Sequence, residues 1–293
     1  MPENPRDIRK RIGSVKNTQK ITSAMKMVAA ARLRRAEERA QASRPYAERL
    51  QTFLNSFTID PENLPHPLAE VRRNVRQRGL LVITSDRGLC GSYNSNILRE
   101  ANKWVKAHDA DQIKLYIVGN KGVSFFKHRH VTIAKQFGNL DQKLDYKEIK
   151  NIADTVANDF MNGVVDEIDL LYSQFVSPAV CRQIKMHLLP ICSTDKKDDV
   201  TEKKDALADF IYEPSPEAIL NILFPKFLYT RIVASLADSF ASEQGQRMVA
   251  MTTATDNAEE MVKALTLQYN KVRQAAITKE LGEIVGGAEA LEK

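Results

Sequence analysis

Apolar residues recur at a fixed spacing through the last quarter of the chain, from about residue 215 to 285. Steps of alternately three and four residues from Leu220 to Ala276 visit 17 positions, and 14 of them are apolar. The exceptions are Thr230, Gln244 and Thr255. A 3.5-residue period sustained over this length is typical of a coiled coil rather than of an ordinary surface helix. It predicts core positions that include Met248, Met251, Val262, Leu265, Tyr269 and Val272.

The flanking residues predict that this stretch is one uninterrupted helix. Ser215 is a good N-cap, and Pro216 suits the first helical position. Between residues 226 and 281 the sequence has no proline and a single glycine, Gly245. About 70 residues at roughly 1.5 Å each give a helix on the order of 100 Å long. A helix of this length needs a partner helix to bury its apolar stripe.

A second long helix is predicted from about Asp7 to Phe57. Its apolar stripe opens with Ile8, Ile12 and Val15 and continues at three-four spacing with Ala29, Leu33, Ala36, Ala40, Ala47, Leu50 and Leu54. Between the two runs the register is ambiguous. Ile21, Met25 and Val28 lie one position off the expected spacing, as a stutter would place them. Pro45 is expected to kink or restart the helix.

Between the two helices, short apolar runs alternate with helical segments. A proline-rich link at 60–67 is expected to end the first helix. Strands are predicted at 79–84, 113–118, 131–137, 169–176 and 184–191, and helices at 94–107, 123–127 and 145–160. Asp145 with Glu148 forms a capping-box-like start for the last of these helices, and Gly163 is expected to stop it. This alternation predicts a mixed or parallel sheet with helices on its faces.

The sequence therefore predicts an α/β protein with two long helices. The N-terminal coiled-coil helix is assigned to 1–59, a central α/β domain to 70–213 and the C-terminal coiled-coil helix to 214–293. Because the α/β domain lies between them, the two helices must run antiparallel if they are to pair. A charged loop at 195–205 is expected to lead back to the second helix.

Composition narrows the classes of function. The chain of 293 residues is 43% hydrophobic and 27% charged, which is ordinary for a soluble protein. Its uninterrupted apolar runs stay below the ~18 residues of a membrane span, and residues 1–4 do not begin a signal peptide. We therefore expect a cytoplasmic protein that reaches a membrane only through a partner. The cysteines, Cys90, Cys181 and Cys192, lack metal-binding or redox spacing.

The positive charge is concentrated at the N-terminal end. Residues 1–50 hold thirteen Lys/Arg and five Asp/Glu, whereas the whole chain carries a net charge of +6. A basic cluster is formed by Arg32, Arg34, Arg35 and Arg39. It is either a solvated helix face or a contact for acidic partner surfaces or nucleic acid. Basic coiled-coil proteins that bind DNA are parallel dimers without an α/β insert, so nucleic-acid binding is kept only as an alternative.

The stretch 86–94 is the candidate nucleotide site, because it follows a predicted strand and opens a predicted helix. Its spacing is G-x-x-G, from Gly88 to Gly91, and neither G-x-G-x-x-G nor a P-loop signature is present. A tight turn that starts at Asp86 is the favoured interpretation, and a Rossmann-type nucleotide-binding protein is the alternative. No local arrangement of catalytic residues can be assembled. We therefore predict no catalytic residue, cofactor or metal.

Four separated segments resemble the gamma subunit of F-type ATP synthase. They are Ile12–Ala31, Ala241–Asn257, Tyr269–Glu280 and Glu283–Ala288, and the turn at 86–94 resembles the family's central-domain motif. The resemblance covers essentially the whole chain. It implies an antiparallel coiled coil that rotates inside a hexamer of alpha and beta subunits. It also implies a Rossmann-like foot domain that stands on the membrane c-ring beside the epsilon subunit.

The resemblance also implies which residues contact the catalytic subunits. They are Arg273, Gln274, Thr278, Glu280, Arg247, Met25, Arg32 and Arg35. It places the protein on the cytoplasmic face of the bacterial plasma membrane, because the cysteine-bearing insert of chloroplast members is absent between Leu189 and Tyr212. Gly245 replaces a residue that is usually alanine, and Gly282 lies near the tip. Each should cost about 1 kcal/mol of helix stability relative to alanine.

Overall fold

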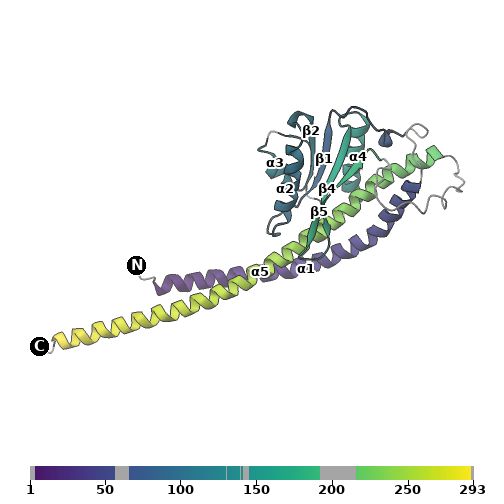
Figure 1. Ribbon diagram of the computed structural model, residues 1–293. Coiled ribbons are helices and arrows are strands. Elements are labelled where there is room, and N and C mark those ends of the chain that lie inside the picture. Colours follow the sequence, from purple (N-terminus) through teal and green to yellow (C-terminus); the bar gives the residue numbers. More distant parts are fainter. Residues whose placement is uncertain are drawn as a thin grey trace. The chain divides into compact units, whose positions relative to one another are not determined.

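The computed structural model describes residues 4–56, 66–129, 131–138, 140, 145–191 and 216–291. The expected helix end at Phe57, most of the proline-rich link, the loop at 195–205, Ser215 and Cys192 lie outside these ranges. Two long helices and a central sheet dominate the structure (Figure 1). The helices are α1 (Pro5–Ser56), α2 (Tyr93–Lys106), α3 (Asn120–Phe126), α4 (Tyr146–Met161) and α5 (Pro216–Leu291), with short 3-10 turns η1 (Pro67–Ala69) and η2 (Ala110–Gln112). The strands are β1 (Arg78–Ile83), β2 (Ile113–Val118), β3 (Thr132–Phe137), β4 (Glu167–Phe175) and β5 (Cys181–Leu189).

The chain forms two compact units. One consists of Met1–Ala29 with Arg247–Lys293, and the other of Ala30–Gln246. This division crosses both long helices, whereas the sequence-based boundaries were drawn at the helix ends. The difference arises because the second half of α1 and the first part of α5 share a hydrophobic core with the sheet, as Leu50 and Phe224 illustrate.

The sheet has five strands in the order β3-β2-β1-β4-β5. The first four are parallel, and β5 pairs antiparallel with β4. The predicted mixed sheet is therefore confirmed, as is each predicted strand to within a few residues. The inner strands are buried on both faces, which is why β1 reads as a continuous apolar run, Leu80–Ile83.

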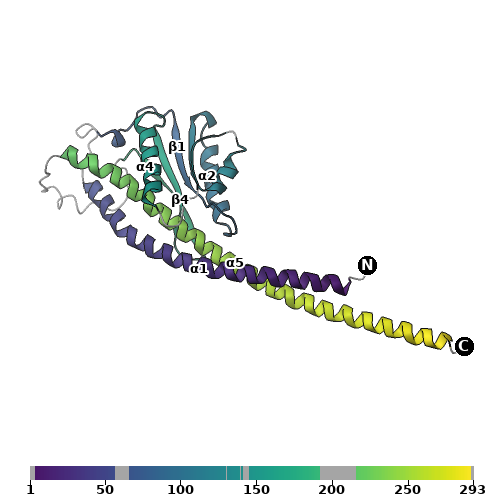
Figure 2. The same ribbon diagram turned by 180° about the vertical axis from the view of Figure 1, so that it is seen from behind.

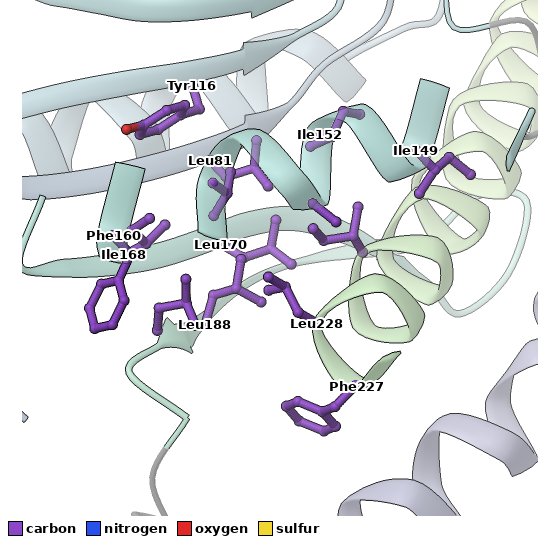
Figure 3. Packing of buried hydrophobic residues seen from close by; sticks show 14 of the residues in the cluster. Leu81, Tyr116, Ile149, Ile152, Phe160, Ile168, Leu170, Leu188, Phe227 and Leu228 are labelled. Atoms are coloured by element: carbon purple, nitrogen blue, oxygen red, sulfur yellow. The ribbon is translucent and has the colours of Figure 1, made fainter. Parts of the chain in front are cut away.

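Two hydrophobic cores lie on opposite faces of the sheet. On one face, Leu80, Val82 and Ile117 pack with residues of α2 and α3. On the other face, Leu81, Tyr116, Ile168 and Leu170 pack with α4 and with the first part of α5, including Phe227 and Leu228 (Figure 3). Helix α5 therefore completes the core of the α/β unit as well as pairing with α1.

Helix α4 begins and ends where its sequence predicts. The Asp145 carboxylate accepts a hydrogen bond from the backbone N–H of Lys147 at 3.0 Å, so Asp145 is the N-cap. Gly163 follows the helix with φ of 74°, a left-handed conformation that glycine adopts without steric cost.

The predicted 3.5-residue period of α5 is confirmed. All 17 positions between Leu220 and Ala276 are buried or partly buried. The structure also places every predicted core residue of both helices, from Ile12 to Val272, in a buried or partly buried position. The helix continues through Gly282 to Leu291.

From Ile8 to Ala40 the seam of α1 keeps its three-four spacing, so the register that the sequence left ambiguous contains no stutter. Ile21 and Val28 point outward, with 60% and 52% of their surface exposed. Gln19, Thr22 and Lys26 continue the seam instead, and each is buried or partly buried. The apolar pattern was misleading here because polar residues occupy the seam while apolar residues face solvent.

Neither internal proline divides its helix. Helix α1 runs through Pro45 and α5 runs through Pro225, so of the two outcomes expected at Pro45, a kink or a restart, the restart does not occur. Both prolines lie on exposed helix faces. A proline interrupts one backbone hydrogen bond, and packing of the helix on either side compensates for that loss.

A polar pair lies in the seam of the first unit. The Thr255 hydroxyl donates to the Thr22 hydroxyl oxygen at 2.8 Å, and Thr22 is buried. Thr255 is one of the three polar exceptions in the α5 pattern. A buried polar pair in a coiled coil favours the one register in which its partners meet.

We predict that the Thr22–Thr255 pair is energetically coupled. Replacing either residue by valine keeps the shape of the side chain but removes the bond, and a double-mutant cycle should give an interaction of about 0.5–1.5 kcal/mol. Urea unfolding followed by circular dichroism measures it. Thr266→Val is the control, because the Thr266 hydroxyl bonds only within its own helix turn. Strictly additive effects of Thr22→Val and Thr255→Val would contradict the coupling.

The two glycines of α5 should respond differently to alanine. A Cβ at Gly282 would meet no atom within 4 Å, whereas a Cβ at Gly245 would lie 2.9 Å from the backbone Cα of Pro178. Gly282→Ala should therefore stabilise the chain by up to about 1 kcal/mol, as helix propensity predicts. Gly245→Ala should lower the unfolding midpoint, since the backbone of residue 178 must move. Equal gains in stability at both positions would show that the Pro178 contact is not restrictive.

Candidate functional site

The last part of α5 extends beyond the end of α1. In the antiparallel register set by Thr22 and Thr255, the first residue of α1, Pro5, lies opposite Val272. Residues 273–291 therefore lie past the first turn of α1, and both ribbon views show this free extension of α5 (Figure 2). The predicted contact residues Arg273, Gln274, Thr278 and Glu280 all lie in this segment, and all four are exposed.

The polar side chains of this segment make few contacts with the chain itself. The Arg273 guanidinium lies 6.0 Å from the ring centroid of Tyr269, one turn earlier. The Thr278 hydroxyl donates to the Gln274 carbonyl oxygen at 3.0 Å. Within the residues that the structure describes, no ion pair involves Arg273 or Glu280. The guanidinium can therefore donate its paired N–H groups to an acceptor on another protein.

The four other predicted contact residues differ in exposure. On α1, Arg32 and Arg35 are exposed and Met25 is partly buried. Arg247 on α5 is only 8% exposed, and its side chain is engaged within the chain. Its predicted contact with a catalytic subunit stays a prediction.

Exposed apolar side chains accompany these polar residues, and the sequence marked only some of them, such as Ile21 and Val28, as lying off the seam. On α1 they are Ile21, Met27 and Val28; on the last part of α5 they are Met261, Leu267, Ile277, Leu281, Ile284 and Val285. Each is at least 47% exposed. Their sequence signal is an apolar residue at a position outside the three-four seam. Apolar surface of this extent typically marks an interaction site.

The turn between β1 and α2 is held by hydrogen bonds of its own side chains. The Asp86 carboxylate accepts a hydrogen bond from the backbone N–H of Asn120, the first residue of α3, at 3.0 Å. The Asn94 side chain bonds Ser85 through its amide nitrogen and its oxygen. Gly91 has φ of 57°. The side chains of Asp86 and Asn94 are thus hydrogen-bonded within the chain, which favours a structural tight turn over a nucleotide site.

The turn between β1 and α2 places Tyr93 against α5. Tyr93 is the first residue of α2 and is buried, and its hydroxyl lies beside the side chains of Ser239 and Glu243. Burial, together with the nearby charge of Glu243, raises the pKa of Tyr93 well above its ordinary value. The hydroxyl therefore stays protonated. Sequence analysis missed this contact because Tyr93 and Ser239 are far apart in the chain.

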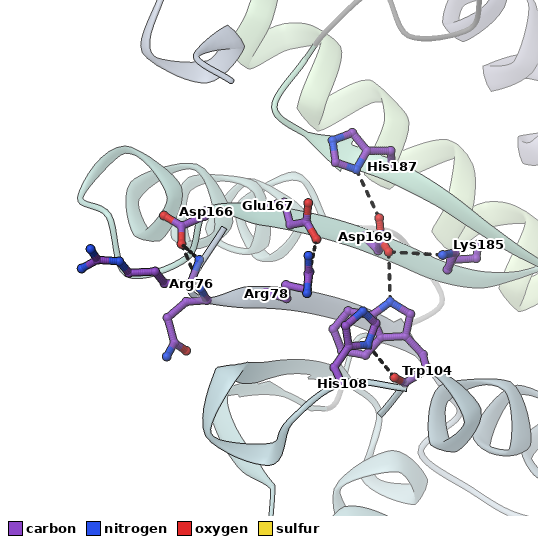
Figure 4. Close-up of polar contacts among 10 residues, drawn as sticks. Arg76, Arg78, Trp104, His108, Asp166, Glu167, Asp169, Lys185 and His187 are labelled. Carbon is purple, nitrogen blue, oxygen red and sulfur yellow. Dashed lines mark hydrogen bonds and ion pairs between the residues drawn. The ribbon is translucent and has the colours of Figure 1, made fainter. Parts of the chain in front are cut away.

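A second polar cluster joins α2 to the sheet (Figure 4). The Asp169 carboxylate accepts hydrogen bonds from the Trp104 indole N–H at 3.0 Å and from His187 at 3.2 Å, and Lys185 lies 3.6 Å away. Burial alone would raise the pKa of Asp169, but these hydrogen bonds and the positive charge of Lys185 lower it. The contacts orient Trp104 on the sheet.

Among the described residues, no group of three or more His, Cys, Asp or Glu side chains could hold a metal ion. Cys90 and Cys181 carry free thiols. By length and composition, the segment 218–285 of α5 could cross a membrane. Buried polar residues such as Asp238, Glu243 and Arg247 are instead typical of a helix packed inside a protein.

Comparison with known proteins identifies the family. The family model described as ATP synthase matches residues 4–291. The ATP synthase gamma chain of Heliobacterium modesticaldum is 44% identical over 98% of both chains, and that of Desulfitobacterium hafniense is 44% identical over 98% of this chain and 99% of the relative. This chain belongs to the ATP synthase gamma-chain family.

Solved structures agree with the gamma-chain fold. A central-stalk chain of the Tetrahymena thermophila mitochondrial ATP synthase superposes with a TM-score of 0.61 at 26% identity, covering 80% of this chain and 99% of that chain. A chain of the Euglena gracilis mitochondrial ATP synthase superposes with a TM-score of 0.69, covering 98% and 94%. Its identity of 18% supports the fold alone. The fold class predicted from sequence is therefore confirmed for this gamma-chain family member.

We predict that Asp169 stabilises the fold in a pH-dependent way. At pH 7, Asp169→Asn should lower the free energy of unfolding by about 1–3 kcal/mol, because charge-assisted hydrogen bonds are lost. The folded-state pKa lies below the ordinary value of 3.8, so this stabilisation is complete above that value and disappears as the pH falls through the folded pKa. The difference between wild type and variant should thus shrink below about pH 4.

Denaturant unfolding between pH 2.5 and 7 tests this prediction, with Asp154→Asn as control. Asp154 pairs with Lys150 on an exposed helix face, where removal of a charge has little effect on stability. A destabilisation by Asp169→Asn that stays constant over the whole pH range would contradict a role for the carboxylate charge.

Proposed function

We propose that this chain is the central rotor shaft of an F-type ATP synthase. In this role it couples ion-driven rotation of the membrane c-ring to sequential conformational change at the catalytic sites of the alpha–beta hexamer. The observation that carries the proposal is membership of the gamma-chain family over residues 4–291, together with an exposed α5 extension that holds the expected contact residues. The epsilon subunit is a further expected partner.

The shaft needs no catalytic residue of its own. A shaft that differs from side to side, inside a ring with threefold repetition, presents a different surface to each catalytic site, so the three sites cannot hold the same state at once. The chemistry then belongs to the hexamer. The chain acts from the cytoplasmic face of the bacterial plasma membrane and meets the membrane only through its partners.

The surface of the α5 extension is suited to packing inside the central cavity of the alpha–beta hexamer. Ile277, Leu281 and Ile284 expose apolar surface that would favour burial against a partner, at about 25 cal/mol per Å² of apolar area removed from water. The basic side chains of Arg32 and Arg35 suit acidic surfaces on the catalytic subunits. Met25 adds an adaptable apolar contact beside them.

Arg273 and Gln274 are the residues on which this proposal can be tested most directly. They are consecutive, lie about 100° apart around the helix axis and flank the partly buried seam residues Val272 and Ala276. The planar guanidinium of Arg273 can bond a carboxylate or a pair of carbonyls in a bidentate geometry that lysine does not reproduce.

We predict that Arg273→Ala with Gln274→Ala still assembles with the hexamer but loses about tenfold in ATP synthesis and hydrolysis, the loss typical of one well-formed interface contact. Arg273→Lys should not restore the rate. Lys271→Ala, at an exposed position two residues before Arg273, is the matched control and should behave as wild type. An assembled double variant that works at the wild-type rate would show that these residues do not contact the catalytic subunits.

The nucleotide-binding alternative is not favoured, because Asp86 and Asn94 in the turn before α2 are hydrogen-bonded within the chain. The nucleic-acid alternative rests only on the basic cluster of α1. Within that cluster, Arg34 pairs with Glu38 on an exposed face at 3.7 Å, as on a solvated helix.

A further inference from the structure

One short segment of α5, Ser239–Gln246, has a second face that does not contribute to the coiled coil. Ser239, Ser242, Glu243 and Gln246 follow i, i+3, i+4, i+7 spacing and therefore share one side of the helix. The seam residues of the same stretch, at positions 237, 241 and 244, lie on the opposite side at 100° per residue. We call the first set the polar face of α5; Gly245 lies beside it, about 100° around the helix axis from Gln246.

The polar face is hydrogen-bonded to both backbone polar groups of one residue in β4, Ser173. The backbone N–H of Ser173 donates to the Ser239 hydroxyl oxygen at 3.3 Å, and the Ser242 hydroxyl donates to the Ser173 carbonyl oxygen at 3.1 Å. Ser173, Ser239 and Ser242 are all buried. Directional bonds to both polar groups of one residue fix where the strand meets the helix and at what angle.

The turn that joins β4 to β5 rests on the next part of the same segment. Gln246 donates its side-chain N–H groups to the carbonyl oxygens of Ala179 at 2.8 Å and Pro178 at 3.4 Å. The absence of a side chain at Gly245 lets Pro178 approach to within 2.9 Å of where a Cβ would lie. Gly245 therefore serves this close approach, which accounts for a glycine in the middle of a long helix.

Helix α2 supplies a third contact through Tyr93. Its buried hydroxyl lies beside Ser239 and Glu243. Three separate elements of the α/β unit thus meet the same two turns of α5. These elements are the start of α2, the strand β4 and the β4–β5 turn.

We propose that the polar face of α5 sets the rotational angle of the helix against the sheet and is the point at which turning force passes from the α/β unit to α5. An apolar stripe alone lets a helix roll, because dispersion and hydrophobic contacts are non-directional. The hydrogen bonds of Ser239, Ser242 and Gln246 and the Gly245–Pro178 approach are lost on a small rotation. This inference rests on the proposed shaft function and assigns these residues as positioning residues within it.

The test uses the assembled ATP synthase that contains this chain. Gln246→Glu keeps the size of the side chain but replaces its donor with an acceptor that faces two carbonyl oxygens. Gln246→Lys restores a donor. Asn221→Asp is the matched control, because it makes the same amide-to-carboxylate change at an exposed position of the same helix. Two rates are measured: ATP hydrolysis by the hexamer detached from the membrane ring, and ATP synthesis by the complete complex in sealed vesicles.

We expect Gln246→Glu to lower ATP synthesis by roughly threefold to tenfold, the factor equivalent to one lost hydrogen bond. Hydrolysis by the detached hexamer should stay at the wild-type rate, since no force then passes through the α/β unit. Gln246→Lys should recover most of the synthesis. Ser242→Ala, which removes a single hydroxyl, should show the same separation of the two rates and covers the case in which Gln246→Glu fails to assemble.

Wild-type synthesis in assembled complexes of both variants would overturn the proposal, and so would equal losses of hydrolysis and synthesis. Neither result would affect the shaft function itself. That function would fail only if complexes without this chain still synthesised ATP, which a parallel preparation lacking the chain measures.

Discussion

The structure depends on the simultaneous burial of two opposite sides of α5. One side carries the three-four seam toward α1, and the other packs on the sheet. From Ser235 to Gly245 every residue of the helix is buried, although several are polar. Burying a polar side chain is costly unless it is hydrogen-bonded, so Ser239 and Ser242 find partners in the backbone of β4. This requirement ties the α/β unit to one defined place along a helix of 76 residues.

The seam itself is built from small and polar residues as much as from large apolar ones. Ala29, Ala40 and Ala47 on α1, and Ala237 and Ala241 on α5, bury little area but let two backbones approach closely. The stability of the α1–α5 pairing then comes from the length of the seam rather than from any one contact. Such a seam specifies register weakly, and the Thr22–Thr255 bond adds a position-specific constraint within it.

Much of this arrangement could be predicted from the sequence, because the period of apolar residues and the alternation of strands and helices are local signals. The register of α1 between Val15 and Ala29 could not, since Gln19 and Lys26 occupy the seam while Ile21 faces solvent. Local spacing also says nothing of contacts between distant segments. The contact of Tyr93 with Ser239 and the approach of Pro178 to Gly245 depend on how the sheet is placed on α5, and only the folded chain shows that placement.

The same reasoning explains why apolar residues stand outside the seam. Ile277, Leu281 and Ile284 cannot pack against α1, because α1 begins opposite Val272 and leaves this segment of α5 unpaired. Isolated in water, an unpaired helix gains little from apolar side chains. Their presence is consistent with a segment that completes its burial against other proteins. Helix α5 thus packs against α1 and against the sheet, and we propose that its last segment packs against the hexamer. In that proposal, the contacts at Ser239–Gln246 fix the angle of α5 on the sheet and so transmit a force from the sheet to the helix.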